Sequence, residues 1–217
     1  MSNCRICKGK LKKIINFGKI ALVGNFFRSK KSLKKFNISL NFCLKCKHLQ
    51  ISEILNQNVL FKNYVWETGV SKSNIDLIKD LISKFKKYGV KKGSQILEIA
   101  SNDGTLLHLI KKKYKCFVLG VDPAKNLKSL AEKKNVKSLP YFFDFRLSKK
   151  IKKKYDLFDI IIARNVIAHV PKPNEIFEGV NKLLNDEGIF ILEVPHLLNI
   201  IKNNQYDNIF HEHIGFH

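Results

Sequence analysis

The sequence predicts an α/β fold in which a parallel sheet follows a small N-terminal metal-binding module. Five apolar runs alternate with amphipathic segments between residues 95 and 195, and strands that alternate with helices form parallel sheets with right-handed crossovers. The fourth run, LFDIIIA, is apolar throughout, which is typical of a strand buried on both faces. Four of the five cysteines form two CxxC pairs ahead of this region. These three observations divide the chain into a small module and a larger α/β part.

The length and hydropathy of the chain favour a soluble protein. A chain of 217 residues can fold as one ordinary domain with a small one beside it. It has no run of 18 apolar residues, and its first residues, MSNCRICKGK, do not form a signal peptide. We therefore expect a cytoplasmic protein without a membrane partner.

The formal net charge of +22 raises the question of nucleic acid binding, since basic patches collect phosphates. The excess is almost all lysine and is spread through every segment together with many Ile and Asn residues. The chain has few arginines, the residues that most often recognise bases in the grooves of DNA. We interpret the lysines as solvated faces that help to attract phosphorylated small substrates, and we expect no nucleic-acid partner.

The two CxxC pairs are predicted to hold one structural zinc ion through Cys4, Cys7, Cys43 and Cys46. A CxxC pair lets two thiolates reach one ion, and a chain without a secretory signal favours zinc over disulfides. A redox pair or unliganded thiols are the alternatives. Four thiolates leave zinc no open position for catalysis. His48 is a possible substitute ligand, but we expect a surface histidine. Residues 1–60 are too few to hold a core alone, so the metal contributes much of their stability.

An aromatic segment, FKNYVWETG at residues 61–69, precedes a helical apolar pattern that runs from Ile75 to Phe85. Tyr64 and Trp66 either line a ligand site or make a hydrophobic contact between domains, and the sequence leaves both open. We assign residues 61–90 to this aromatic linker and its helix.

Residues 95–107, QILEIASNDGTLL, predict a strand, a tight turn and the start of a helix. Such a junction leaves backbone N–H groups beside the carboxyl end of a strand, where open α/β sheets bind ligands. The second strand ends at Asp122-Pro123, and Asp122 follows Glu98 by 24 residues. This is close to the spacing that places an acid against ribose hydroxyls in dinucleotide-type folds. A helix N-cap, with proline at the first helical position, is the alternative for Asp122.

The next two strands also end in polar or aromatic residues. A short strand near residues 136–139 leads into Tyr141-Phe142-Phe143-Asp144, which can sandwich a purine and accept from its exocyclic amine, or can belong to the core. The fourth strand ends in Arg164-Asn165. Because the carboxyl ends of parallel strands share one edge of a sheet, four residues are expected to gather there: Gly104, Asp122, Asp144 and Asn165.

These residues resemble class I S-adenosylmethionine-dependent methyltransferases. More narrowly, the chain resembles nucleotide-sugar C-methyltransferases, which methylate C-3 of dTDP-4-keto-deoxy sugars. The matching pieces run the full length of the chain: the CxxC pairs, ALVGNFF, CLKCKHLQ, EIASNDGTLL, GVDPAKN, ARNVIAHV, LEVPHLL and YDNIFHEH. The resemblance implies a Rossmann-like sheet of strand order 3-2-1-4-5 behind a zinc-binding domain, with S-adenosylmethionine and zinc as cofactors and a nucleotide sugar as substrate.

The resemblance also implies the residues that bind the cofactor. Motif positions assign contacts to Ala100, Asn102, Asp103, Asp122 and Asn165, and the predicted set is completed by Glu98, Gly104, Pro123 and Phe143. Ala100 stands where the family usually has glycine, and its methyl group would crowd the turn that faces the cofactor's carboxylate.

The resemblance assigns the chemistry to His211-Glu212-His213. Methylating a carbon next to a ketone requires removal of an α-proton, and a histidine with a pKa near neutrality suits that step. His213 is the predicted general base, with Glu212 orienting the base or the substrate and His211 completing the catalytic cluster. Phe210 stands where the family usually has tyrosine. A His-x-His metal site or a polar surface loop are the alternatives for this cluster.

Members of the family continue beyond the point at which this chain stops. We therefore expect a C-terminally truncated chain, with a zinc-binding domain at 1–60, the linker at 61–90 and a truncated cofactor-binding domain at 91–217. Two other functions stay open: O- or N-methylation of another small acceptor, and a non-catalytic basic module that binds nucleic acid. The sequence names neither the sugar nor the oligomeric state.

Overall fold

The computed structural model describes residues 3–23 and 33–217, and these residues form two compact units. The first, here called the cysteine unit, contains the described residues up to Asn56 together with Asn165–Asn174 and Glu193–His217. The second, here called the sheet unit, contains Gln57–Arg164 and Glu175–Leu192. In the described residues, no helix combines the length and the apolar character that are needed to span a bilayer.

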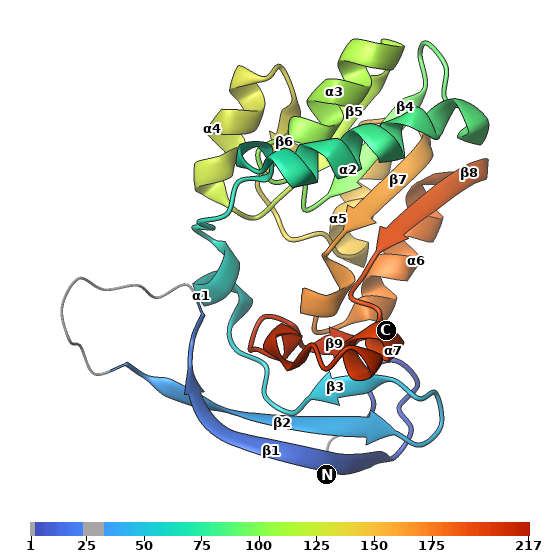
Figure 1. Cartoon of the computed structure of the whole chain (residues 1–217). Helices are drawn as coiled ribbons and strands as arrows, with labels where there is room; N and C mark the ends of the chain where they lie inside the picture. Colours follow the sequence, from blue (N-terminus) through green and yellow to red (C-terminus); the bar gives the residue numbers. More distant parts are fainter. Residues whose placement is uncertain (1–2, 24–32) are drawn as a thin grey trace. The chain divides into compact units, whose positions relative to one another are not determined.

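The sheet unit is built on a five-stranded sheet of order β6-β5-β4-β7-β8 (Figure 1). Its strands are β4 (Gln95–Ile99), β5 (Phe117–Val121), β6 (Lys137–Leu139), β7 (Phe158–Arg164) and β8 (Leu184–Glu193). The pairs β4–β5, β4–β7 and β5–β6 are parallel. In order of appearance this is 3-2-1-4-5, so the predicted strand order is confirmed.

Helices follow the strands in the predicted alternation. They are α1 (Gln57–Phe61), α2 (Lys72–Ser83), α3 (Thr105–Tyr114), α4 (Lys125–Lys133), α5 (Phe145–Lys152) and α6 (Pro173–Leu183), with 3-10 turns η1 (Thr68–Val70) and η2 (Phe85–Tyr88). Figure 1 shows α2 and α3 across one face of the sheet. Alternate residues of β4 and β7, such as Ile96 and Ile160, form a buried cluster with Ile78 of α2 and Leu106 of α3. This packing fixes where β4 ends and α3 begins.

The cysteine unit contains a second, four-stranded sheet of order β1-β2-β3-β9 (Figure 1). Its strands are β1 (Leu11–Ala21), β2 (Lys35–Cys43), β3 (Leu49–Ile51) and β9 (Gly215–Phe216), joined by α7 (Leu197–Lys202) and the 3-10 turns η3 (Ile167–His169) and η4 (Tyr206–Asn208). Of the ALVGNFF motif, residues 24–27 lie outside the described residues. The pairs β1–β2, β2–β3 and β3–β9 are antiparallel. The last strand therefore comes from the far end of the chain.

Residues near the C-terminus also complete the core of the cysteine unit. Ile38, Leu40, Leu49 and Ile51 pack in one buried cluster with Ile200, Ile214 and Phe216. The guanidinium of Arg5, which lies between Cys4 and Cys7, donates to the carbonyls of Ile51 and Ile214. The N-terminal module thus gains an apolar core in addition to its metal ligands, whereas the sequence-based boundary at residue 91 groups residues 193–217 with the α/β part.

We expect Phe216→Ala to destabilise the cysteine unit by about 3–5 kcal/mol, because the side chain is fully buried and its removal leaves a cavity. Tyr206→Ala is the control in the same unit, since Tyr206 is 76% exposed and its removal should change stability by less than about 0.5 kcal/mol. Urea denaturation followed by circular dichroism measures both. Equal midpoints for the two variants would contradict the core described above.

Candidate functional site

The turn between β4 and α3 has an unusual backbone. Ala100, Asn102 and Gly104 have φ angles of 55°, 51° and 73°, all in the left-handed region. Asparagine and glycine adopt this conformation readily, but for other L-residues it costs about 1–2 kcal/mol. The strain therefore falls on Ala100, at the position where the sequence already departs from the family pattern. Ser101 N donates to the carbonyl of Val121, which ties the turn to the neighbouring strand.

Asp122 fastens the same turn to the end of β5. Its Oδ2 accepts from the backbone N–H of Asn102 at 2.8 Å, and its Oδ1 accepts from that of Ala124 at 2.8 Å. Burial raises the pKa of this carboxyl, while the two backbone N–H groups act in the opposite direction. The alternative of a helix N-cap is wrong, because the N-cap of α4 is Ala124. Ribose binding by Asp122 stays a prediction.

Asp103 is committed to contacts inside the protein. Its side chain is almost fully buried, with Oδ1 3.2 Å from the N–H of Thr105 and Oδ2 3.0 Å from the N–H of Gly69 and 2.7 Å from Nζ of Lys134. Burial alone would raise its pKa, but the hydrogen bonds from Lys134 and Thr105, the Lys134 charge and the Gly69 N–H outweigh it and hold the pKa below its usual value. The side chain of Asp103 therefore stabilises the turn, and a cofactor contact at Asp103 stays a prediction.

Lys134 also stabilises this turn, although nothing in the sequence indicated it. Besides Asp103 Oδ2, its ammonium contacts the carbonyl of Asp103 at 3.0 Å and Oγ1 of Thr105 at 2.8 Å. One ammonium thus satisfies three oxygens at the start of α3. No local pattern marks this lysine, because its partners lie about thirty residues earlier in the chain.

The aromatic segment predicted at residues 61–69 lies along this turn, and we call residues 62–69 the strap. The side chain of Asn102 donates through Nδ2 to the carbonyl of Trp66 at 2.9 Å, and its Oδ1 accepts from the N–H of Thr68 at 2.8 Å. A Cβ at Gly69 would lie 2.7 Å from Thr105 Oγ1, so only glycine permits this approach. The strap is held against the turn by the very residue that the motif assigns to the cofactor.

A second asparagine holds the other end of the strap. Asn126 of α4 accepts from the N–H of Tyr64 at 3.1 Å and donates to its carbonyl at 2.8 Å. Lys125 N donates to the carbonyl of Lys62 at 3.2 Å. Trp66, the single tryptophan of the chain, is 54% exposed. The strap therefore lies against the turn and α4, and the predicted ligand contact of Tyr64 and Trp66 stays a prediction. The exposed indole of Trp66 is a built-in fluorescent reporter of this region.

The remaining predicted cofactor residues are placed less uniformly. Glu98 is buried within β4, and Pro123 is half-buried after β5. Phe143 is buried and packs on Gly179 of α6, where a Cβ would lie 2.9 Å from its ring, while Tyr141 and Phe142 are exposed. Phe143 is therefore part of the core of the sheet unit, and the predicted purine contact would have to be made by a ring that is already buried.

Two further residues at strand ends make contacts of their own. Asp144 caps α5 by accepting from Leu147 N at 2.7 Å. Asn165 directly follows β7 with φ 52°, and its Nδ2 donates to Oε1 of Glu193 at 2.8 Å. The edge residues therefore do not share one role: Asp122 braces the turn, Asp144 caps a helix, and Asn165 bonds to Glu193.

The four cysteines form a cluster that fits zinc. Their Sγ atoms all lie within 4.8 Å of one another, with Cys4–Cys46 at 3.6 Å and Cys7–Cys43 at 3.4 Å. Zn–S bonds of about 2.3 Å in tetrahedral geometry place sulfurs about 3.8 Å apart. Lys8 and Lys47, one residue after each CxxC pair, both adopt left-handed φ angles, so the two knuckles share one backbone geometry.

His48 is not the surface residue that was expected. It is buried, and its Nδ1 lies 3.0 Å from the carbonyl of Phe216, to which it must donate because a carbonyl only accepts. Its ring lies beside that of His217, with centroids 4.8 Å apart. The expectation failed because the fourth strand of this sheet comes from the other end of the chain and covers His48.

His213, the predicted general base, is half-buried in the cysteine unit. Its Nδ1 lies 2.8 Å from the carbonyl of Asn208. The carbonyl can only accept, so Nδ1 carries the proton and Nε2 keeps the lone pair that a base needs. Burial lowers the pKa of His213, against a smaller opposite effect of the Asn208 carbonyl. Its ring packs against Phe210, with centroids 4.2 Å apart.

His169 stands beside His213 and was not singled out from the sequence, although it lies in the quoted segment ARNVIAHV. The two ring centroids are 4.9 Å apart. His169 Nδ1 donates to the carbonyl of Glu212 at 2.9 Å. Burial first, and then the charge of His213, lower the pKa of His169 to about 4. A histidine a few residues after the carboxyl end of a buried strand is the signal that could have identified it.

His211 serves a different purpose from His213. It is 2% exposed, its Nε2 lies 3.1 Å from the carbonyl of Phe36, and its ring contacts the Phe36 ring edge-on at 5.9 Å. This geometry anchors the segment to β2 and favours packing over the predicted catalytic role. The surface-loop alternative for the cluster is wrong, because His211 is buried. Among the described residues, the group of three or more side chains that could hold a metal ion consists of the four cysteines and does not include this histidine cluster.

Comparisons with known proteins match both parts of the chain. The family model of a methyltransferase domain matches residues 72–217, and that of a zinc binding domain matches residues 4–61. The chain is 29% identical over 221 residues to the C-methyltransferase NovU of Streptomyces niveus, an alignment that covers 100% of this chain and 52% of NovU. The chain therefore spans about half the length of this curated relative.

Among solved structures, one from Galdieria sulphuraria, described as a sarcosine dimethylglycine methyltransferase, aligns with a TM-score of 0.51. The identity is 14%, and the alignment covers 65% of this chain and 57% of that chain. At this identity the likeness concerns the fold.

We expect Ala100→Gly to raise the free energy of unfolding by about 0.5–1 kcal/mol, because relief of left-handed strain outweighs the extra freedom that glycine has in the unfolded chain. Ala124→Gly is the matched control: Ala124 has φ −73°, so glycine there should destabilise by a similar amount. Thermal unfolding measures both variants, and Trp66 fluorescence during titration with S-adenosylhomocysteine reports whether the site remains intact. A loss of stability in both variants would show that Ala100 is unstrained.

Proposed function

Because the chain belongs to the family of methyltransferase domains, we propose that it transfers the methyl group of S-adenosylmethionine to a carbon next to the ketone of a nucleotide-linked 4-keto-deoxy sugar. At the level of the family, the predictions of a methyltransferase fold, of S-adenosylmethionine as cofactor and of a zinc-binding N-terminal module are confirmed. The carbon acceptor and the sugar are the proposal. They are supported by the similarity to NovU, a C-methyltransferase, and by the geometry of His213.

The observation that carries the proposal is the tautomer of His213. With Nδ1–H held by the Asn208 carbonyl, Nε2 is an unprotonated base on a half-buried ring. C-methylation needs such a base, because the α-carbon becomes a nucleophile only when its proton is removed. The lowered pKa of His213 keeps the ring neutral near pH 7, ready to accept a proton.

His213 Nε2 takes the proton at C-3 of the sugar, and the C–H electron pair passes into an enolate whose oxygen is the former ketone oxygen. S-adenosylmethionine, when bound, would supply an electrophilic methyl group; the enolate carbon would take this group, and the C–S electron pair would stay on sulfur. The half-buried Glu212 would orient the base or the substrate. The charge that His213 would gain lowers the pKa of the neighbouring His169, so His169 stays neutral while His213 carries the proton.

Within the sheet unit, the turn at residues 100–104, the carboxylate of Asp122 and the strap would form the cofactor site. Glu98, Gly104, Pro123 and Phe143 complete the proposed set in this unit, and the cofactor contact at Asn165, a residue of the cysteine unit, stays a prediction. A zinc centre built from four thiolates suits a reducing compartment, so we place the protein in the cytoplasm.

Deuterium washout tests the assignment of the base. A nucleotide-linked 4-keto sugar deuterated at C-3 should lose its label to the solvent when incubated with the protein and S-adenosylhomocysteine. His213→Asn should slow this loss by a factor of about 100–10,000, the usual contribution of a general base. His196→Asn, at an exposed histidine of the same unit, should leave it unchanged. Washout at the parental rate in His213→Asn would exclude His213, and washout absent from the parent would favour an O- or N-acceptor.

The pH dependence gives an independent test. Since burial lowers the pKa of His213 from its ordinary value of 6.5, the neutral base is the major form above pH 6.5. The washout rate should therefore be constant between pH 7 and 8.5 and should fall only on acidification below about pH 6.5. His213→Asn should lack this acidic limb. A rate that keeps rising between pH 7 and 8.5 would mean that another group with a higher pKa removes the proton.

A further inference from the structure

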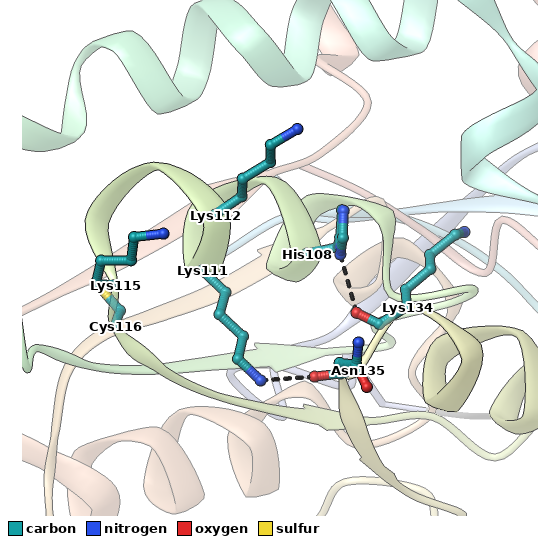
Figure 2. Close-up of a pocket in the computed structure, with 7 residues that line it drawn as sticks. All are labelled: His108, Lys111, Lys112, Lys115, Cys116, Lys134 and Asn135. Carbon is teal, nitrogen blue, oxygen red and sulfur yellow. Dashed lines mark hydrogen bonds between the residues drawn. The ribbon is translucent and has the colours of Figure 1, made fainter.

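A hollow of about 410 Å³ lies between α3 and the turn that follows α4, and Figure 2 shows the side chains around it. Its lining is His108, Lys111, Lys112, Lys115, Cys116, Lys134 and Asn135. Four of these seven residues are lysines and none is acidic. The lining of the hollow therefore carries positively charged side chains and no carboxylate.

Two hydrogen bonds give this hollow a defined wall. His108 Nδ1 donates to the carbonyl of Lys134 at 2.9 Å, and Lys111 Nζ donates to that of Asn135 at 2.8 Å. Figure 2 shows both bonds reaching from α3 to the turn. Asn135 adopts a left-handed φ of 57°, which reverses the chain at this point. One wall of the hollow is thus a backbone turn that two side chains of α3 hold by hydrogen bonds.

Three of the four lysines at the hollow take part in no ion pair between described residues, and one of them, Lys111, is bonded to the Asn135 carbonyl. The ion pairs found between described residues include Lys134–Asp103, but neither Lys112 nor Lys115 takes part in one. Both side chains are exposed, and Lys115 is the C-cap of α3. Like charges held near one another raise the local potential, and an anion lowers it.

The chemistry of the lining selects the kind of anion. Lysine ammonium groups are point-charge donors that suit phosphate oxygens. The lining has no Phe, Tyr or Trp on which a base could stack, as a binding site for single-stranded nucleic acid requires. The hollow is also much smaller than a groove that follows a polynucleotide. We propose that it is a binding site for a phosphate or diphosphate group, free or carried by a small molecule, and that Lys134 links its occupancy to the cofactor turn.

The link follows from the two roles of Lys134. Its carbonyl belongs to the wall of the hollow through His108, and its ammonium contacts Asp103 and Thr105 at the turn. A ligand that shifts Lys134 changes both the hollow and the turn. By thermodynamic reciprocity, a ligand bound at either site then changes the affinity of the other site for its own ligand. This link rests on cofactor binding by the turn, whereas phosphate binding by the hollow does not.

Isothermal titration calorimetry with pyrophosphate tests the site at constant ionic strength. The parent should bind one equivalent, and the double variant Lys112→Gln/Lys115→Gln should bind it about tenfold more weakly. The matched control is Lys150→Gln/Lys153→Gln, which removes one exposed lysine from α5 and one from its C-cap, at the same spacing. The control should bind pyrophosphate like the parent. Absence of binding by the parent, or equal weakening in both double variants, would overturn the site.

The same titration with adenosine diphosphate and with an oligothymidylate identifies the source of the phosphate. Equal affinity for pyrophosphate and adenosine diphosphate supports recognition of the phosphate alone, and tighter binding of adenosine diphosphate supports a carried diphosphate. Preference for the oligothymidylate would overturn the small-anion assignment. Saturating pyrophosphate should also change the affinity for S-adenosylhomocysteine, read from Trp66 fluorescence, by about threefold or more in the parent and not in the hollow variant. An unchanged affinity would overturn the link through Lys134.

Discussion

The structure of the turn at residues 100–104 depends on two buried carboxylates that accept backbone N–H groups. Asp122 joins the N–H of Asn102 to that of Ala124, and Asp103 joins the N–H of Thr105 to that of Gly69. Each carboxylate is desolvated, which is costly unless it is well hydrogen-bonded. Lys134 supplies the countercharge for Asp103, whereas Asp122 has two backbone donors in place of a cation. The left-handed backbone of Ala100 and Asn102 persists because these bonds over-determine the turn.

The cysteine unit shows how the ends of the chain support one another. The zinc knuckles set β2 and β3, and β3 pairs with β9 through Leu49 and Gln50. Ile214 N donates to the carbonyl of Ala168 at 2.7 Å, which ties the segment before β9 to the residues that follow β7. His169 and His213 therefore meet on a frame whose first strands are fixed by metal ligands. A structural metal can thus influence the proposed proton-transfer site without touching it, since metal-binding free energy is also folding free energy for such modules.

The sequence predicted the strand order of the sheet unit and the four metal ligands, because long apolar runs and CxxC spacing are local signals. It did not predict the pairing of β3 with β9. A two-residue strand such as Gly215–Phe216 has no periodicity, and its partner lies more than 160 residues away. The same reason explains the error at His48, which Phe216 covers, and the omission of Lys134. The residues at the sheet edge were identified from the sequence, but their protein partners were not, because an aspartate that also braces a turn has the same sequence pattern as one that only binds a ribose.

The paired histidines favour one direction of proton transfer. His213 donates through Nδ1 to the carbonyl of Asn208, so its Nε2 is unprotonated, and His169 donates through Nδ1 to the carbonyl of Glu212. Burial lowers both pKa values, and a charge on His213 lowers that of His169 further. Because burial disfavours the protonated form of His213, a proton that this ring accepts is released readily to water. Such a pair suits a base that removes a proton in each turnover, whereas a general acid would need a raised pKa. The buried surroundings of these rings thus support proton abstraction, the step on which methylation at carbon depends.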